Sequence, residues 1–296
     1  MSWSDRTIWY PFTLADGNGW AFGAEDDLRS WMARFATVLK LDEGPADGKR
    51  KILFTQHPPS SPVWKYRDLR YLRVWSHAGW PGYLIQILRL QDQGSSIDYF
   101  RMRDTLSFLC TELLPSGALP LHAAFLSRKN DGVVIAAPGG TGKSTCAARA
   151  PPPWEGLGDD MAVIVRDTNG AYHAHPLPTW SDLTMRGHTE KTWDLRGNRP
   201  IRAVYFLEQA DHDAAVPVGQ GEAAVEITAS AIQIIQLYLR HLDTPAARRF
   251  RADIFANAST LACRVPAFRL SATRHGRFWE EIERSMASCA EGRGTN

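Results

Sequence analysis

Residues 137–144 read Ala-Pro-Gly-Gly-Thr-Gly-Lys-Ser, and this segment constrains the fold of the chain more than any other. It follows the apolar run 132–136 and precedes the small-residue segment 145–149, which together predict a strand, a loop and a helix in succession. Glycines let backbone N–H groups wrap around a phosphate, and a helix that begins there adds a favourable field for an anion. Residues 137–144, the glycine-rich loop, are therefore predicted to bind a nucleotide.

Two side chains at the end of the glycine-rich loop carry its expected chemistry. Lys143 would reach the β- and γ-phosphates of the nucleotide, and the hydroxyl of Ser144 would bind Mg²⁺. ATP and Mg²⁺ are the expected cofactors, although the sequence does not decide between ATP, GTP and pyrophosphate. The predicted nucleotide-binding residues are Ala137, Pro138, Gly139, Gly140, Thr141, Gly142, Lys143, Ser144 and Thr145.

The composition is that of a globular protein, since the 296 residues are 44% apolar and 22% charged. A net charge of +2 provides no overall attraction to nucleic acid or to a membrane surface. Residues 1–6 lack the layout of a secretion signal, and no apolar run is long enough to span a bilayer. The four cysteines are scattered, which argues against a metal cluster or a disulfide framework. We expect a cytoplasmic protein that binds neither nucleic acid nor membrane.

The chain is expected to form an α/β protein of two domains: a tryptophan-rich α+β domain, residues 1–115, and a nucleotide-binding domain with a mixed sheet and C-terminal helices, residues 116–296. The boundary falls at the Leu-Pro-Ser-Gly segment 114–117. The patterns of the first domain predict a hairpin over 6–23, a helix over 26–40, a loop over 41–62, strands over 71–75 and 83–88, and a helix over 104–114. Those of the second predict strands at 161–165 and 203–207 and helices at 229–242, 245–261 and 278–290.

The strand that leads into the glycine-rich loop is predicted to be the second strand of a hairpin. The apolar runs 121–126 and 132–136 flank Asp131-Gly132, a dipeptide typical of a two-residue turn. Most phosphate-binding loops follow a parallel strand, so an antiparallel predecessor is unusual. Counting outward from this turn places His122 opposite Thr141. An imidazole is therefore expected beside the nucleotide.

Asp159 and Asp160 form the second candidate group. In ordinary ATPases and GTPases the metal-associated acid follows an apolar strand, whereas this pair precedes the strand predicted at 161–165, and residues 151–158 are not expected to be a strand. One carboxylate would hold Mg²⁺ and the other would take a proton from an attacking hydroxyl, with His122 influencing which one acts as the base. The alternative is a solvated turn that precedes a strand.

The spacing of four residues resembles that in the catalytic core of the HPr kinase/phosphorylase family. These residues are His122, Lys143, Asp159 and Asp160, and the resemblance covers roughly residues 117–270. Residues 12–17 with Trp20 are also similar to the HPr-kinase-related proteins of peptide-modifying gene cassettes. The resemblance implies a phosphoenolpyruvate-carboxykinase-like fold and transfer of phosphate from ATP to a protein serine. The family often forms hexamers, which is compatible with a homo-oligomer, but the sequence contains no assembly signature and does not decide the oligomeric state.

Carried over residue by residue, the resemblance implies Ser144 and Asp160 at the metal, Asp159 or Asp160 as the base, and His122 as the partner of the base. The family's protein kinases also have a metal-binding Glu two residues before an Arg-Gly pair. Here Thr184 stands in that place before Arg186-Gly187, and the candidate replacements are Asp182 and Glu190. The family's phosphorolysis segment has no counterpart, so phosphate-dependent dephosphorylation is not expected.

Other groups have ordinary as well as functional interpretations. A basic stretch is either a solvated loop or the source of an arginine for the transferring phosphate: Arg186, Lys191, Arg196, Arg199 and Arg202. His173 and His175 alternate on a strand without a third ligand at metal-binding spacing, which favours ordinary strand histidines. Most of the 11 tryptophans precede residue 81, where core packing is favoured over a peptide-binding surface.

The sequence therefore predicts an ATP- and Mg²⁺-dependent kinase whose partner is a peptide or small protein with a Ser or Thr acceptor hydroxyl. A small-molecule alcohol is the nearest alternative acceptor. A different class is an ATPase or nucleotide switch, in which Glu208, after the strand at 203–207, would be the essential acid. A third class is a non-catalytic protein that keeps the loop and binds a precursor peptide through tryptophan-rich surfaces.

Overall fold

The first of two sheets is built from residues 8–87 in the computed structural model, which describes residues 7–88, 96–184 and 190–293. Its strand order is β1-β2-β3-β6-β5-β4, with β2–β3 and β3–β6 parallel and the other pairs antiparallel. The strands are β1 (Ile8–Thr13), β2 (Gly19–Ala24), β3 (Arg50–Thr55), β4 (Lys65–Asp68), β5 (Leu72–Ser76) and β6 (Gly82–Ile87). Side chains of α1 (Arg29–Val38) and α2 (Ser96–Leu113) pack into its core.

The second sheet leads into the glycine-rich loop and runs in the order β10-β8-β9-β13-β12-β11-β7, with β15 beside β13 and β14 beside β15. β13 joins its two halves, because Arg199 and Pro200 pair with β12 and residues 201–209 pair with β9 and β15. The strands are β7 (Leu119–Leu121), β8 (Ala123–Arg128), β9 (Asp131–Ala136), β10 (Trp154–Gly158), β11 (Met161–Arg166), β12 (Tyr172–Leu177), β13 (Arg199–Gln209), β14 (Ala214–Pro217) and β15 (Ala267–Ala272).

Helices cover both faces of this second sheet. Residues of α5 and α6 share one hydrophobic cluster with it, and residues of α3 and α7 share another, which makes the chain an α/β protein with mixed sheets. Within the described ranges, no helix combines the length and apolar character that crossing a bilayer requires. The helices are α3 (Lys143–Arg149), α4 (Trp180–Thr184), α5 (Gln220–Leu239), α6 (Thr244–Ala262) and α7 (Phe278–Arg293).

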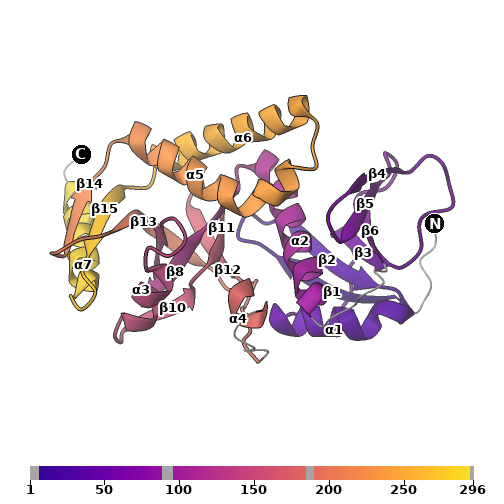
Figure 1. The fold of residues 1–296 in the computed structure, drawn as a ribbon, viewed down its shortest axis with the longest axis horizontal. Coiled ribbons are helices and arrows are strands. Elements are labelled where there is room, and N and C mark those ends of the chain that lie inside the picture. Colours follow the sequence, from indigo (N-terminus) through magenta and orange to yellow (C-terminus); the bar gives the residue numbers. More distant parts are fainter. Residues whose placement is uncertain (1–6, 89–95, 185–189, 294–296) are drawn as a thin grey trace.

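The two sheets meet around α2, which lies between them and beside α5 (Figure 1). One hydrophobic cluster contains side chains from both sheets and from the helix, among them Phe22, Phe54, Leu106, Val163 and Leu177. A continuous apolar core stabilises the contact between elements that are far apart in the sequence. The segment 114–117 separates the sheets along the chain, but a shared core joins them in space.

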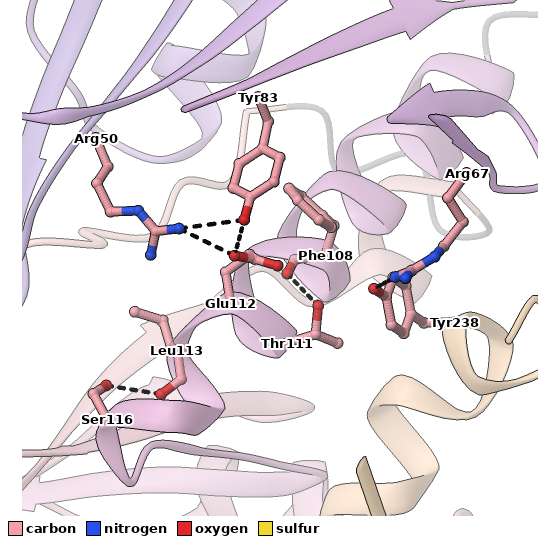
Figure 2. Close-up of polar contacts among 9 residues, drawn as sticks. All are labelled: Arg50, Arg67, Tyr83, Phe108, Thr111, Glu112, Leu113, Ser116 and Tyr238. Atoms are coloured by element: carbon pink, nitrogen blue, oxygen red, sulfur yellow. Dashed lines mark hydrogen bonds and ion pairs between the residues drawn. The ribbon is translucent and has the colours of Figure 1, made fainter. Parts of the chain in front are cut away.

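Polar contacts also cross this junction (Figure 2). Arg67 of β4 donates a hydrogen bond to the phenol oxygen of Tyr238 in α5. The phenol of Tyr83 in β6 donates to the carboxylate of Glu112 in α2, which Arg50 of β3 also contacts at 3.1 Å. Burial of the Tyr83 phenol and its bond to Glu112 raise the pKa of that phenol. The first sheet is therefore held to both α2 and α5.

Most of the predicted elements are confirmed, although α2 and α5 begin at Ser96 and Gln220 rather than at 104 and 229. The loop predicted over 41–62 is wrong, because β3 lies within it and forms the strand between β2 and β6. Its fully buried apolar core is short, comprising Ile52, Leu53 and Phe54. The polar, Gly- and Pro-rich residues around that core dominated the composition of the segment.

β10 is another strand that the sequence pattern did not predict, as are β4, β14 and β15. Its two glycines lower the strand propensity, but Gly156 lies against α3, where an added Cβ would lie 3.2 Å from the carbonyl oxygen of Ala147. Glycine at this position permits the close approach of strand and helix. The expectation that residues 151–158 are not a strand is therefore wrong, and Asp159 and Asp160 connect β10 to β11.

The predicted antiparallel pairing of β8 and β9 is confirmed, but the turn is Lys129-Asn130 rather than Asp131-Gly132. Lys129 has a positive φ of 59°. Gly132 stays in the strand, where an added Cβ would lie 2.9 Å from the ring of Phe125. The glycine is therefore needed for close packing against Phe125 and not for the turn. In the observed register Ala123 pairs with Ala136, so His122 flanks the start of the glycine-rich loop instead of lying opposite Thr141.

The early tryptophans pack mainly into the first sheet, on both of its faces. Trp20 and Trp31 are buried with α1 in the main core. On the other face, Trp75 is buried with Leu53 and Leu84, and three partly buried tryptophans pack against them: Trp9, Trp64 and Trp80. Core packing of these side chains agrees with the preferred interpretation of the sequence.

The two histidines of β12 have protein partners for their ring nitrogens. His173 contacts Asn198 at 2.9 Å and Asp167 at 3.2 Å. His175 is fully buried, donates from Nδ1 to the carbonyl of Leu195 at 2.8 Å, and accepts at Nε2 from the backbone N–H of Ala15 at 3.1 Å. His175 thereby ties the β1–β2 turn to the second sheet, and burial lowers the pKa of its imidazole to about 4.

The buried imidazole of His175 makes stability depend on pH. The native protein keeps it neutral down to about pH 4, whereas an unfolded histidine is protonated below about pH 6.5. We therefore expect the free energy of unfolding to be highest above pH 6.5 and to fall by up to roughly 3 kcal/mol as the pH drops towards 4. Urea titrations at several pH values should show a smaller decline for His175→Gln. Equal declines in the two proteins would contradict this role.

Candidate functional site

Three chain segments meet at one edge of the second sheet because of how β10, β8 and β9 are paired. β9 ends at the glycine-rich loop, and the antiparallel strand β8 begins at that same edge. β10 is antiparallel to β8 and therefore ends there as well. The edge consequently gathers His122 before β8, the glycine-rich loop after β9, and Asp159 with Asp160 after β10. The backbone N–H of Ala123 also donates to the carbonyl of Asp160 at 3.2 Å.

The glycine-rich loop is closed around the side chain of Lys143. Gly140 and Gly142 have φ of 80° and 116°, values that L side chains rarely adopt. The lysine is buried, and its Nζ donates to the carbonyl oxygens of Ala137 at 2.8 Å and Pro138 at 3.1 Å. Burial lowers the pKa of the ammonium group, and the charges of the two aspartates oppose that shift.

His122 and Asp160 are in direct contact. The Nε2 atom of the imidazole lies 3.1 Å from Oδ1 of the carboxylate, and Nδ1 lies 2.6 Å from the amide oxygen of Gln233 in α5. An amide oxygen only accepts, so Nδ1 donates to Gln233. The backbone of His122 is fixed as well, because its carbonyl accepts from the Ser230 hydroxyl at 3.2 Å. The imidazole is therefore oriented from α5 and faces the carboxylate.

Asp159 has a different neighbourhood from Asp160. Its carboxylate accepts a hydrogen bond from the hydroxyl of Thr179, a buried residue between β12 and α4. Asp159 and Ser144 line one cavity of about 340 Å³, together with Lys191. Asp160 and His122 line another, larger cavity of about 690 Å³. The two aspartates are adjacent in the sequence but therefore line two separate cavities.

The middle of the glycine-rich loop and the first turn of α3 face a third cavity. Gly140, Thr141, Gly142 and Thr145 line a cavity of about 480 Å³ that also reaches the end of β13. Gln209 of β13 donates from its side-chain amide to the carbonyl of Thr141 at 3.2 Å. The loop is therefore supported from β13 on this side.

Of the predicted basic stretch, Lys191 lines the cavity of Ser144 and Asp159. The other described members bind elsewhere: Arg196 contacts Asp42, Arg199 contacts the carbonyl of Asn198, and Arg202 contacts Asp131. Arg186 and the Arg-Gly pair lie outside the described residues. Asp182, a predicted replacement for the missing metal ligand, is fully buried and bound by Lys191. Glu190, the other replacement, is exposed.

Three residues that position the site were not predicted from the sequence: Thr179, Gln209 and Gln233. Each is far along the chain from the group that it contacts. No local pattern identifies them, because polar side chains are common in every kind of element and are mostly solvated. Their roles depend on tertiary packing.

A known protein family matches much of the chain. The family described as SynChlorMet cassette protein ScmC matches residues 86–287. The chain belongs to this family. The match begins in β6, ends in α7 and includes His122, the glycine-rich loop, both aspartates and Gln233. No curated protein matches the chain.

The positive φ of Gly142 provides a test of the loop geometry. An added Cβ at Gly142 meets no atom within 4 Å, so any effect of alanine comes from the backbone conformation. We expect Gly142→Ala to lower the free energy of unfolding by about 1–2 kcal/mol. Gly139→Ala is the matched control, because Gly139 also has open space and lacks a positive φ. Urea titrations should find the control within about 0.5 kcal/mol of wild type. Equal losses in both variants would contradict the assigned strain.

Proposed function

We propose that this protein transfers the γ-phosphate of ATP, with Mg²⁺, to a Ser or Thr hydroxyl of a peptide or small protein. The observation that carries the proposal is the contact between His122 and Asp160 at the edge where Lys143 closes the glycine-rich loop. A carboxylate oriented by an imidazole suits a general base, and a lysine in a glycine-rich loop suits a polyphosphate. Both groups lie at the same edge of the second sheet, as a transfer reaction requires.

The loop and Lys143 would stabilise negative charge on the transferred group. In this structure Lys143 donates to two loop carbonyls, so its ammonium group already points across the loop. With ATP bound, the same donors would turn to the β- and γ-phosphate oxygens. Backbone N–H groups of residues 139–144 would add hydrogen bonds that are fixed before the reaction begins.

The cavity between α3 and β10 fits a magnesium site. It brings together the hydroxyl of Ser144 and the carboxylate of Asp159, and oxygen ligands of this kind are those that Mg²⁺ prefers. Mg²⁺ bound there would neutralise phosphate charge. Asp159 therefore replaces Asp160 as the favoured metal ligand, because Asp160 is engaged by His122.

Asp160 would accept the proton of the acceptor hydroxyl. It lies on the larger cavity with His122, separate from the space that Ser144 lines, so the acceptor and the metal would approach from different sides. His122 would stabilise the carboxylate and hold its orientation, since Gln233 fixes the ring from behind. Holding the base and the acceptor in place supplies much of the catalysis in such transfers.

The proposed fold is that of the phosphoenolpyruvate-carboxykinase-like proteins, to which the HPr kinase/phosphorylase family belongs. An antiparallel strand before the loop strand and a His-Lys-Asp-Asp spacing support the resemblance. The ATPase alternative receives less support. Glu208 accepts a hydrogen bond from the Ser271 hydroxyl at 2.8 Å, so its carboxylate is engaged by the neighbouring strand β15.

The test is mass spectrometry of serine-containing peptides after incubation with ATP and Mg²⁺. We expect phosphorylated product from wild type, and a rate about 10²–10⁴-fold lower for Asp160→Asn, because the base is lost while the side-chain size is kept. Glu208→Gln is the matched control and should keep a rate within a few-fold of wild type. Lys143→Ala should abolish transfer.

Two outcomes would reject the proposal. Loss of ATP hydrolysis in Glu208→Gln, with normal activity in Asp160→Asn, would favour the ATPase. Binding of a peptide by Lys143→Ala, with no phosphate transfer by wild type, would favour a non-catalytic binding protein.

A further inference from the structure

The cavity on which His122 and Asp160 lie is enclosed by helices from both parts of the chain. α2 and the buried residues of α4 share a hydrophobic cluster with the first sheet, whereas α5 packs mainly with the second. The cavity has a volume of about 690 Å³, within the range of sites that enclose an organic ligand. Besides His122 and Asp160 it is lined mainly by hydroxyl, amide and aromatic side chains, including Phe100, Ser107, Trp180, Ser181, Thr184 and Gln233.

Among the described residues that line this cavity, Arg103 of α2 is the one arginine or lysine. Its Nε and Nη2 atoms contact the carboxylate of Asp104 at 3.2 and 3.0 Å, and its guanidinium lies 5.1 Å from the centre of the Phe100 ring. Asp104 is buried, which raises the pKa of its carboxyl group, and Arg103 most strongly opposes that shift. These contacts hold the guanidinium in place. Among the described residues its Nη1 atom makes no hydrogen bond, so this donor remains for a ligand.

A second cavity of about 310 Å³ continues the first along α2 and α5, and the two cavities together form a cleft. Ser107 lines both, and Asp104 and Tyr238 extend the wall by one helical turn or less. Arg70, Arg240 and His241 stand at its rim and are exposed. Three arginines against one aspartate make the far part of this cleft basic, whereas Asp160 makes the end near the glycine-rich loop acidic.

The walls of the cleft are held together by the contacts at the junction of the sheets. Tyr238 of α5 accepts from Arg67 of β4, and its ring packs against Phe108 of α2 at 6.4 Å between ring centres (Figure 2). A ligand in the cleft would therefore contact a surface that is formed before it binds. A fixed surface lowers the entropic cost of ordering side chains on binding.

We propose that this cleft takes an acidic segment of the acceptor peptide. The acceptor hydroxyl lies at the end with His122 and Asp160, and carboxylates of the same peptide lie along Arg103, Arg70 and Arg240. The hydroxyl and amide side chains between the two ends supply partners for the backbone of the peptide. The difference in charge between the two ends of the cleft also fixes the direction in which the peptide binds, because Asp160 repels carboxylates and the arginines attract them. That the cleft receives the acceptor rests on the proposed function.

Binding is measured without nucleotide, by fluorescence anisotropy, with three labelled peptides of equal length and one central serine. Aspartates and glutamates flank the serine in the first peptide, asparagines and glutamines in the second, and lysines in the third. We expect the acidic peptide to bind about tenfold or more tightly than the neutral one, and less tightly as salt is added. Equal affinity for all three, or a preference for the basic peptide, would overturn the inference.

Variants locate the binding site. Arg103→Gln should weaken binding of the acidic peptide about tenfold, because a charge-assisted hydrogen bond is lost. The pair Arg70→Gln and Arg240→Gln tests the rim while the contact between Arg103 and buried Asp104 is kept, and should also weaken binding. Arg166→Gln is the matched control, since Arg166 is exposed at the end of β11 away from Met161, which lines the cavity. An equal loss in the control would overturn the assignment.

The same peptides separate this inference from the proposed function. If the acidic peptide binds in this charge-dependent way but is not phosphorylated, the kinase proposal fails and the assignment of an acidic ligand to the cleft stands. If the neutral peptide is phosphorylated with the same kcat/KM as the acidic one, the kinase proposal stands and the acidic preference fails.

Discussion

The antiparallel pairing of β8 with both β9 and β10 is the constraint on which the candidate site depends. Since β8 runs opposite to its two neighbours, its first residue lies at the edge where they end. A helical crossover before β9 would have left that edge without His122. The hairpin instead brings an imidazole, a glycine-rich loop and two carboxylates together from three separate positions in the chain. The backbone bond from Ala123 to Asp160 secures the same arrangement.

Much of this geometry could be predicted from the sequence. The apolar runs around the 129–132 turn indicated the hairpin, and the composition of residues 137–144 indicated the loop. The exact turn could not be predicted, because Asp131-Gly132 is a favourable turn dipeptide in isolation and the packing of Gly132 against Phe125 is a tertiary effect. β10 was missed for a similar reason. Gly156 is unfavourable in a strand until α3 approaches it closely.

The candidate site was likewise predictable from the sequence only in part. Motif residues were identified because their spacing carries chemical meaning, and His122 and Asp160 do meet. The separation of Asp159 from Asp160 was not predictable, since it depends on Thr179 and on the cavities at either side. The basic stretch also needed the structure, because three of its described arginines bind groups away from the loop and Lys191 lines its cavity. The sequence pattern identifies the candidate reacting groups, whereas tertiary packing determines which of them line the same cavity.

Helix α5 contacts both parts of the molecule at once. Ser230 and Gln233 bind the backbone and the ring of His122, and Tyr238, little more than a turn further along, bonds to Arg67 of the first sheet. A helix is stiff over this length, so the two contacts cannot shift independently. A displacement of the first sheet that Tyr238 followed would therefore also move the side chains that hold the imidazole. Through α5, the first sheet is thereby connected to the His122 imidazole that faces Asp160.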